Sequence, residues 1–101
     1  MLKNFRTYQL SVEFYHECLK VKLPSYLQDQ LLRASSSVAL NLAEGYGKLT
    51  RKDQRKFFHQ SFGSLRECQA IFDLHPGNPQ LKIKSNHLAA CLHKLCKSMG
   101  P

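Results

Sequence analysis

Residues 25–46 read SYLQDQLLRASSSVALNLAEGY, and this stretch decides the fold class. Its apolar residues recur at alternating spacings of three and four, which places them along one side of an α-helix. They are Leu27, Leu31, Ala34, Val38 and Leu42. Ser25 with Gln28 resembles a capping box that opens the helix. Gly45 and Gly47 predict where it ends, because glycine readily adopts the left-handed conformation found after helices.

The same periodicity predicts three more helices, over about residues 4–21, 51–74 and 79–98. Their expected core stripes are Phe5, Tyr8, Val12, Tyr15 and Leu19 in the first, Phe58, Ser61, Leu65, Cys68 and Phe72 in the third, and Leu81, Leu88, Leu92, Leu95 and Met99 in the fourth. Thr50 and Asn78 are suited to cap the last two helices. The prediction is an all-α domain spanning residues 1–101, an up-down-up-down antiparallel four-helix bundle with short connections.

The first two helices carry a second apolar face, opposite the first. A bundle helix needs only one apolar stripe, and contiguous exposed apolar area usually marks a protein interface. We therefore predict a homo-oligomer. The expected interface residues are Leu10, Phe14, Cys18, Leu32, Ala39, Leu40, Ala43 and Tyr46. The alternative is that the second face packs under the fourth helix or a loop.

Positive charge is concentrated after the second helix. The chain has a formal net charge of +8, and no acidic residue follows Asp73. Basic residues on a solvated helix face suit contacts with nucleic-acid phosphates, which give affinity with little sequence preference. The candidate phosphate contacts are Lys48, Arg51, Lys52, Arg55, Lys56 and Arg66. The alternative is a charged face that only aids solubility.

The sequence contains little that would support a catalytic site or a cofactor-binding site. Glu13 and His16 form the only Glu-x-x-His pair, without the partners that a two-metal bundle needs. Cys91 and Cys96 point to different sides of a helix, which argues against a local zinc site. We therefore expect a non-enzyme that binds no metal or cofactor. The four cysteines lie within helical patterns, and no apolar run is long enough to span a membrane, so the prediction is a cytoplasmic protein with reduced thiols.

Two stretches carry a family resemblance: LLRASSSVALNLAEGYG at residues 31–47 and FFHQSFGSLREC at residues 57–68. They resemble the paired signature of four-helix-bundle proteins associated with intervening sequences in bacterial 23S ribosomal RNA genes. The pattern is Ser-hydrophobic-x-x-Asn-hydrophobic-Ala-Glu-Gly followed by Gly-Ser-Leu-x-Glu. The same fold family includes the accessory variability determinant of diversity-generating retroelements. That relative forms a five-fold barrel whose basic surface engages a reverse transcriptase and nucleic acid.

The resemblance implies a homopentamer with a role on structured RNA. Its matched polar residues are expected to link the second and third helices, or neighbouring subunits. They are Asn41, Glu44, Ser64 and Glu67. Gly63 would let another backbone approach closely. Two functions remain open: an accessory protein that binds RNA or DNA, and a scaffold whose basic face docks an acidic protein such as a reverse transcriptase. A small-molecule or metal-binding bundle is a remote third.

Overall fold

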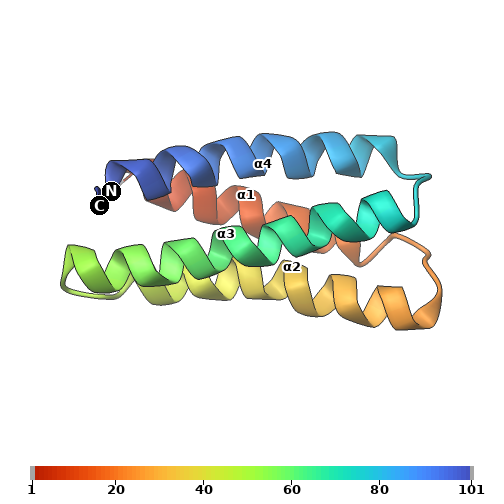
Figure 1. Ribbon diagram of the computed structural model, residues 1–101, viewed down its shortest axis with the longest axis horizontal. Helices are drawn as coiled ribbons and strands as arrows, with labels where there is room; N and C mark the ends of the chain where they lie inside the picture. Colours follow the sequence, from red (N-terminus) through yellow and green to blue (C-terminus); the bar gives the residue numbers. More distant parts are fainter. Residues whose placement is uncertain (1, 101) are drawn as a thin grey trace.

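The computed structural model describes the backbone of residues 2–100 and the side chains of residues 6–100. Within that part of the chain there are four α-helices and no strand: α1 (Leu2–Cys18), α2 (Ser25–Tyr46), α3 (Arg51–Leu74) and α4 (Pro79–Ser98) (Figure 1). The bounds of α2, α3 and α4 coincide with the predicted ones, whereas α1 ends at Cys18 and not at residue 21. The side chain of Phe5, an expected core residue, lies outside the described residues.

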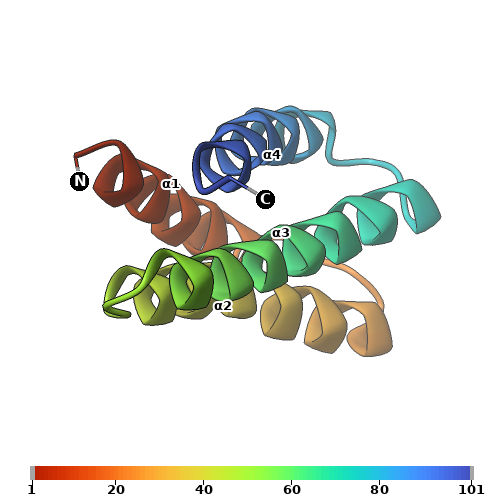
Figure 2. The same cartoon turned by 60° about the vertical axis from the view of Figure 1, so that its left-hand side comes forward.

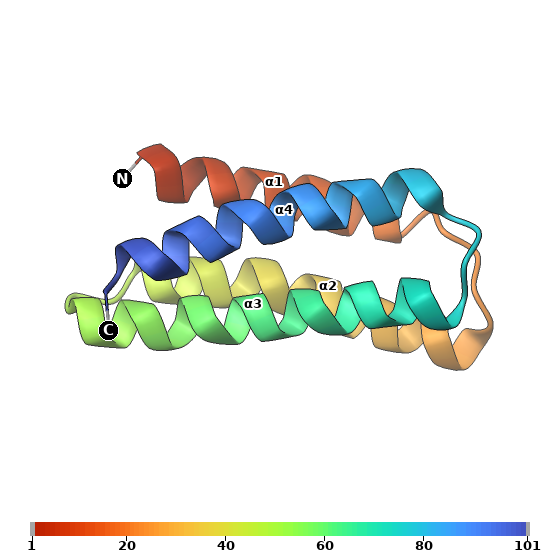
Figure 3. The same ribbon diagram turned by 45° about the horizontal axis from the view of Figure 1, so that its top comes forward.

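The helices form a ring in which each packs against two neighbours, in the order α1, α2, α3 and α4. The α2–α3 connection lies at one end of the elongated molecule, and the α1–α2 and α3–α4 connections lie at the other (Figure 1). The α2–α3 pair has the most extensive contact and the α1–α4 pair the least. Figure 3 shows α1 and α4 moving apart toward the end that holds the α2–α3 connection, and Figure 2 shows both helices on one side of the α2–α3 pair. The bundle is therefore tightest along α2 and α3.

Small residues let α2 and α3 approach closely. Gly45 is buried inside the last turn of α2, and a Cβ built on it would lie 2.8 Å from Cε1 of Phe58 and 3.0 Å from Cβ of Phe57. Farther along the same contact between α2 and α3, the buried Ser61 hydroxyl donates a hydrogen bond to the Val38 carbonyl across 2.7 Å. The predicted core stripes of α2 and α3 are confirmed, since every member is buried. The α2–α3 pair is therefore the most closely packed part of the protein, and α1 and α4 pack against it.

The predicted orientation of α1 is wrong. Phe14 is 2% exposed and Cys18 is fully buried, whereas Leu19 of the expected core stripe is 49% exposed. Thr7 and Ser11 are the other buried residues of this face, which is therefore mostly small. The Ser11 hydroxyl donates to the Tyr8 carbonyl across 2.6 Å, so burying it leaves no polar group unpaired. Phe14 and Cys18, which we assigned to a contact with a second chain, are therefore covered by this one.

Small side chains and one aromatic contact favour this face. The ring of Phe14 meets that of Phe72 edge-on, with centroids 6.4 Å apart and planes at 87°. This is a preferred geometry for aromatic pairs. The expected stripe contains Tyr8 and Tyr15, whose hydroxyls would need partners in the core. Both tyrosines instead lie at its margin, half-buried.

The helix ends agree with the predictions only in part. Thr50 caps α3 by accepting a hydrogen bond from the Asp53 amide across 3.2 Å, as expected. No capping box opens α2, because Gln28 donates instead to the carbonyl of Cys18. Asn78 occupies the N-cap of α4 without a side-chain hydrogen bond. Gly47 has a φ of −80°, so the expected left-handed stop is also wrong.

None of the helices in the described part of the chain is both long enough and apolar enough to cross a bilayer.

Candidate nucleic-acid interface

The outward side of α3 carries a row of basic residues, which we call the α3 basic face: Lys52, Lys56, His59 and Arg66. All four are exposed. At about 100° per residue they lie on the side opposite the buried Phe58 and Leu65. Within residues 6–100, none of them forms an ion pair with a carboxylate. Their charge is directed to solvent.

The other three candidate phosphate contacts are engaged within the chain. Lys48 forms an ion pair with Glu44 at 3.3 Å. Arg51 donates to the carbonyl of Ser98 across 2.6 Å, and Arg55 donates to the carbonyl of Gly100 across 3.0 Å. Carbonyls at a helix C-terminus carry partial negative charge and lack helical partners. The two arginines therefore hold the end of α4 against the start of α3.

Two phenylalanines, Phe57 and Phe62, lie beside the basic residues and were not among the site residues predicted from the sequence. The ammonium of Lys48 lies 5.1 Å from the ring centroid of Phe57, and that of Lys56 lies 5.8 Å from it. The guanidinium of Arg66 lies 4.7 Å from the ring centroid of Phe62. A cation over an aromatic face is attracted by the ring quadrupole. The signal available in the sequence was that residues 57 and 62 fall outside the core stripe of α3.

The cations of α4 divide into two groups. Lys82 is paired with Asp73 of α3, and Lys84 is paired with Glu17 of α1. Lys94 and Lys97 are exposed, and no carboxylate contacts them within the described residues. The second half of α4 therefore adds two exposed cations to those of α3. In the half of α4 nearest the α3–α4 connection, the charges of Lys82 and Lys84 are neutralised by these carboxylates.

The polar residues of the two motif-bearing stretches are placed differently from one another. Asn41 donates from Nδ2 to both the carbonyl and the hydroxyl of Ser37, each across 2.9 Å. The hydroxyls of Ser37 and Ser64 are 2.8 Å apart, so this chain of contacts joins α2 to α3. Glu44 pairs with Lys48 and Glu67 is exposed, and neither contacts the opposite helix within the described residues. Within residues 6–100, only the chain neighbours and the helix's own backbone lie within 4 Å of the missing Cβ of Gly63.

An exposed apolar strip remains on α2. Leu40 is 68% exposed and Tyr46 is 37% exposed, and Ala43 lies between them on the same outward side. Leu32 and Ala39 are half-buried beside it, toward α1. We call these residues the α2 apolar strip: Leu32, Ala39, Leu40, Ala43 and Tyr46. Of the predicted interface, this strip is accessible to a second chain, whereas Phe14 and Cys18 are not, and Leu10 packs partly against the core.

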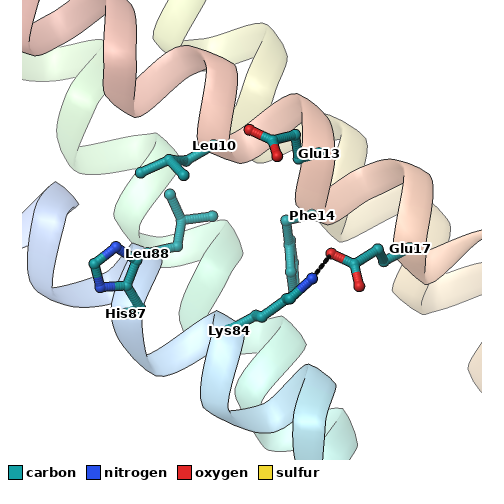
Figure 4. A pocket seen from close by; sticks show the side chains of 7 residues that line it. All are labelled: Leu10, Glu13, Phe14, Glu17, Lys84, His87 and Leu88. Carbon is teal, nitrogen blue, oxygen red and sulfur yellow. Dashed lines mark hydrogen bonds and ion pairs between the residues drawn. The ribbon is translucent and has the colours of Figure 1, made fainter.

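A small pocket of about 140 Å³ opens between α1 and α4 (Figure 4). Leu10, Phe14 and Leu88 lie between the two helices, and Lys84 reaches across to Glu17 at the rim. Pockets for cofactors are typically larger, roughly 300 Å³ or more. No cluster of three or more histidine, cysteine or acidic side chains in the described part of the chain is arranged to hold a metal ion.

Burial makes the core thiols poor nucleophiles. It raises the pKa of Cys18 to about 12, and it raises the pKa of Cys68 further still. Desolvation is the main cause in both, since a buried thiolate loses its water. Burial also raises the pKa of the half-buried Cys96. Because the thiolate is the reactive form, these thiols act as small core side chains at neutral pH.

Comparison with known proteins gives a family but no individual relative. Neither the curated proteins nor the solved structures include a match to this chain. A family model described as 23S rRNA-intervening sequence protein matches residues 3–99, which covers all four helices apart from the first residue of α1. The two motif-bearing stretches, residues 31–47 and 57–68, lie in the closely packed α2–α3 pair. The chain therefore belongs to the family of 23S rRNA-intervening sequence proteins.

Proposed function

We propose that this chain is a non-catalytic accessory protein that binds structured RNA through the α3 basic face. The observation that carries the proposal is the set of exposed cations on one side of α3, at Lys52, Lys56 and Arg66, with no carboxylate partner in the described chain. Lysine and arginine presented in this way bind phosphates and release counterions. The family's name refers to 23S rRNA intervening sequences, so a fragment of ribosomal RNA is the structured RNA to test first.

The test of RNA binding is a filter-binding titration with a structured RNA at two salt concentrations. We expect binding at low salt that weakens steeply as salt rises, because phosphate contacts release counterions. A duplex DNA of similar length distinguishes a general polyanion preference from an RNA preference. Negligible binding at low salt would favour the other candidate, a scaffold whose basic face docks an acidic protein such as a reverse transcriptase.

We further propose that the protein is an up-down-up-down antiparallel bundle that assembles into a homo-oligomer, a pentamer by the family resemblance. The placement of the connections in Figure 1 supports the topology. The α2 apolar strip supports the assembly, because contiguous apolar surface usually marks an interface. Assembly would repeat the α3 basic face on each subunit and so present several positive surfaces to one RNA.

Sedimentation at micromolar concentration tests the assembly. We expect a multimer that Leu40→Glu dissociates, because a carboxylate buried in an apolar interface loses its hydration. Ile83→Glu is the matched control: Ile83 is 65% exposed on α4, outside the strip, compared with 68% for Leu40. A monomeric wild-type protein of 11.6 kDa would remove the assembly proposal.

A further inference from the structure

An open hollow of about 370 Å³ lies on the seam between α3 and α4. Its lining residues are Arg66, Gln69, Asn86, Ala89, Ala90 and His93. Asn86 and His93 are seven residues apart, so they lie on the same side of α4, two turns from one another. The alanines between them leave space because their side chains are short. The seam therefore contains a recess with polar groups from both helices around it.

The polar groups of the hollow are held in place by one another. Arg66 donates from Nη1 to Oε1 of Gln69 across 2.8 Å, and its guanidinium stacks on Phe62. Gln69 in turn donates from Nε2 to Oδ1 of Asn86 across 2.8 Å. The ring of His93 also lies near that of Phe62, with centroids 6.2 Å apart and planes at 42°. Arg66 is thus oriented by an aromatic ring and a neutral amide, with its charge uncompensated.

The hydrogen-bonding capacity that remains in the hollow is dominated by donors. The acceptor oxygens of Gln69 and Asn86 are both engaged, which leaves Nδ2 of Asn86 and further N–H groups of Arg66 without an acceptor in the described chain. His93 adds at least one ring N–H. No carboxylate lines the hollow. A ligand that suits this set accepts hydrogen bonds and carries negative charge.

We propose that this seam hollow is a phosphate-binding site in which Arg66, Asn86 and His93 donate to one phosphate group. The proposal rests on the proposed RNA function and adds residues of α4 to it. A phosphate is favoured over a carboxylate because its oxygens are arranged tetrahedrally and can accept donors that converge from two helices. The phosphate can come from an RNA backbone or from a free phosphate ion, and the experiment separates the two sources.

The first measurement is RNA affinity of variants. Arg66→Gln is expected to weaken binding roughly tenfold, the effect of losing one charge-assisted contact. Arg33→Gln, which removes the same charge from an exposed site on α2, is expected to weaken it by less than about threefold. Ala90→Glu places a carboxylate beside the hollow and is expected to weaken binding more than Gln80→Glu, which adds the same charge in the first turn of α4.

The second measurement is heteronuclear NMR of the side-chain signals of Arg66, Asn86 and His93 during titration with inorganic phosphate, with sodium acetate at equal ionic strength, and with RNA. Shifts with RNA, with or without inorganic phosphate, support the site. Shifts with inorganic phosphate in a protein that binds no RNA support a free-phosphate site and remove the RNA function alone. Equal shifts with acetate, or no shift with any phosphate, overturn the proposal even if RNA binds elsewhere on α3.

Discussion

Replacing Gly45 with alanine is expected to lower the free energy of unfolding by roughly 1–3 kcal/mol, the cost of overpacking a close contact. The added Cβ would lie 2.8 Å from the ring of Phe58 and 3.0 Å from Cβ of Phe57. Phe58 is fully buried, so its ring has little room to move. Urea denaturation followed by helical circular dichroism measures the change.

Gly63 provides the matched control for this variant. It is also a helical glycine of the same family signature, but apart from its chain neighbours and its own helix backbone no described atom lies within 4 Å of its missing Cβ. Gly63→Ala is therefore expected to raise the free energy of unfolding by about 0.5–1 kcal/mol, because alanine favours the helix. Equal stability of Gly45→Ala and the wild-type protein would show that the α2–α3 contact relaxes without cost. A destabilised Gly63→Ala would indicate a neighbouring subunit at that position.

The double substitution Lys52→Glu/Lys56→Glu is expected to weaken RNA binding by about 100-fold, since two phosphate contacts are replaced by repulsion. The slope of log affinity against log salt concentration should also fall by about two units per bound protomer. Stability should change little, because both lysines are exposed and neither pairs with a carboxylate in the described chain. Filter binding across a salt series measures both quantities.

Arg51→Glu/Arg55→Glu reverses the same number of positive charges one residue earlier along the helix. These arginines hold the carbonyls of Ser98 and Gly100. We expect this variant to lose roughly 1–2 kcal/mol of stability, from two hydrogen bonds of ordinary strength, with a smaller effect on RNA affinity than the lysine variant. The opposite ranking would contradict the division of the basic residues that the structure indicates.

The sequence predicted the helices better than it predicted the faces of α1. In α2 and α3 every member of the predicted stripe is buried, although large apolar residues such as Leu40 and Phe62 lie outside the stripes. In α1 both sides are apolar, and the buried side contains Thr7, Ser11 and Cys18. The predicted stripe was chosen for the larger side chains of Tyr8, Tyr15 and Leu19 over these small residues. Packing favours them because they are small and because the Ser11 hydroxyl bonds to its own helix.

The candidate interface shows the same limit. Counting basic residues located the charge on α3, and Lys52, Lys56 and Arg66 are exposed as expected. The sequence contained no sign that Arg51 and Arg55 reach the end of α4, since these contacts join residues 45 or 47 positions apart. It also gave no sign that Gln69 and Asn86 meet across the α3–α4 seam. Contacts between helices depend on how the helices cross, which periodicity along one helix does not specify.

The chain of contacts from Asn41 through Ser37 to Ser64 affects which alternative packings the protein can adopt. Two helices that met only through alkyl side chains could slide past each other by one turn and bury nearly the same area. Such a slip here would separate the hydroxyls of Ser37 and Ser64, which are partly buried. Both would lose this hydrogen bond, and that loss would cost free energy. The polar contact therefore fixes the register of α2 against α3, much as a single buried polar residue selects one register in a coiled coil.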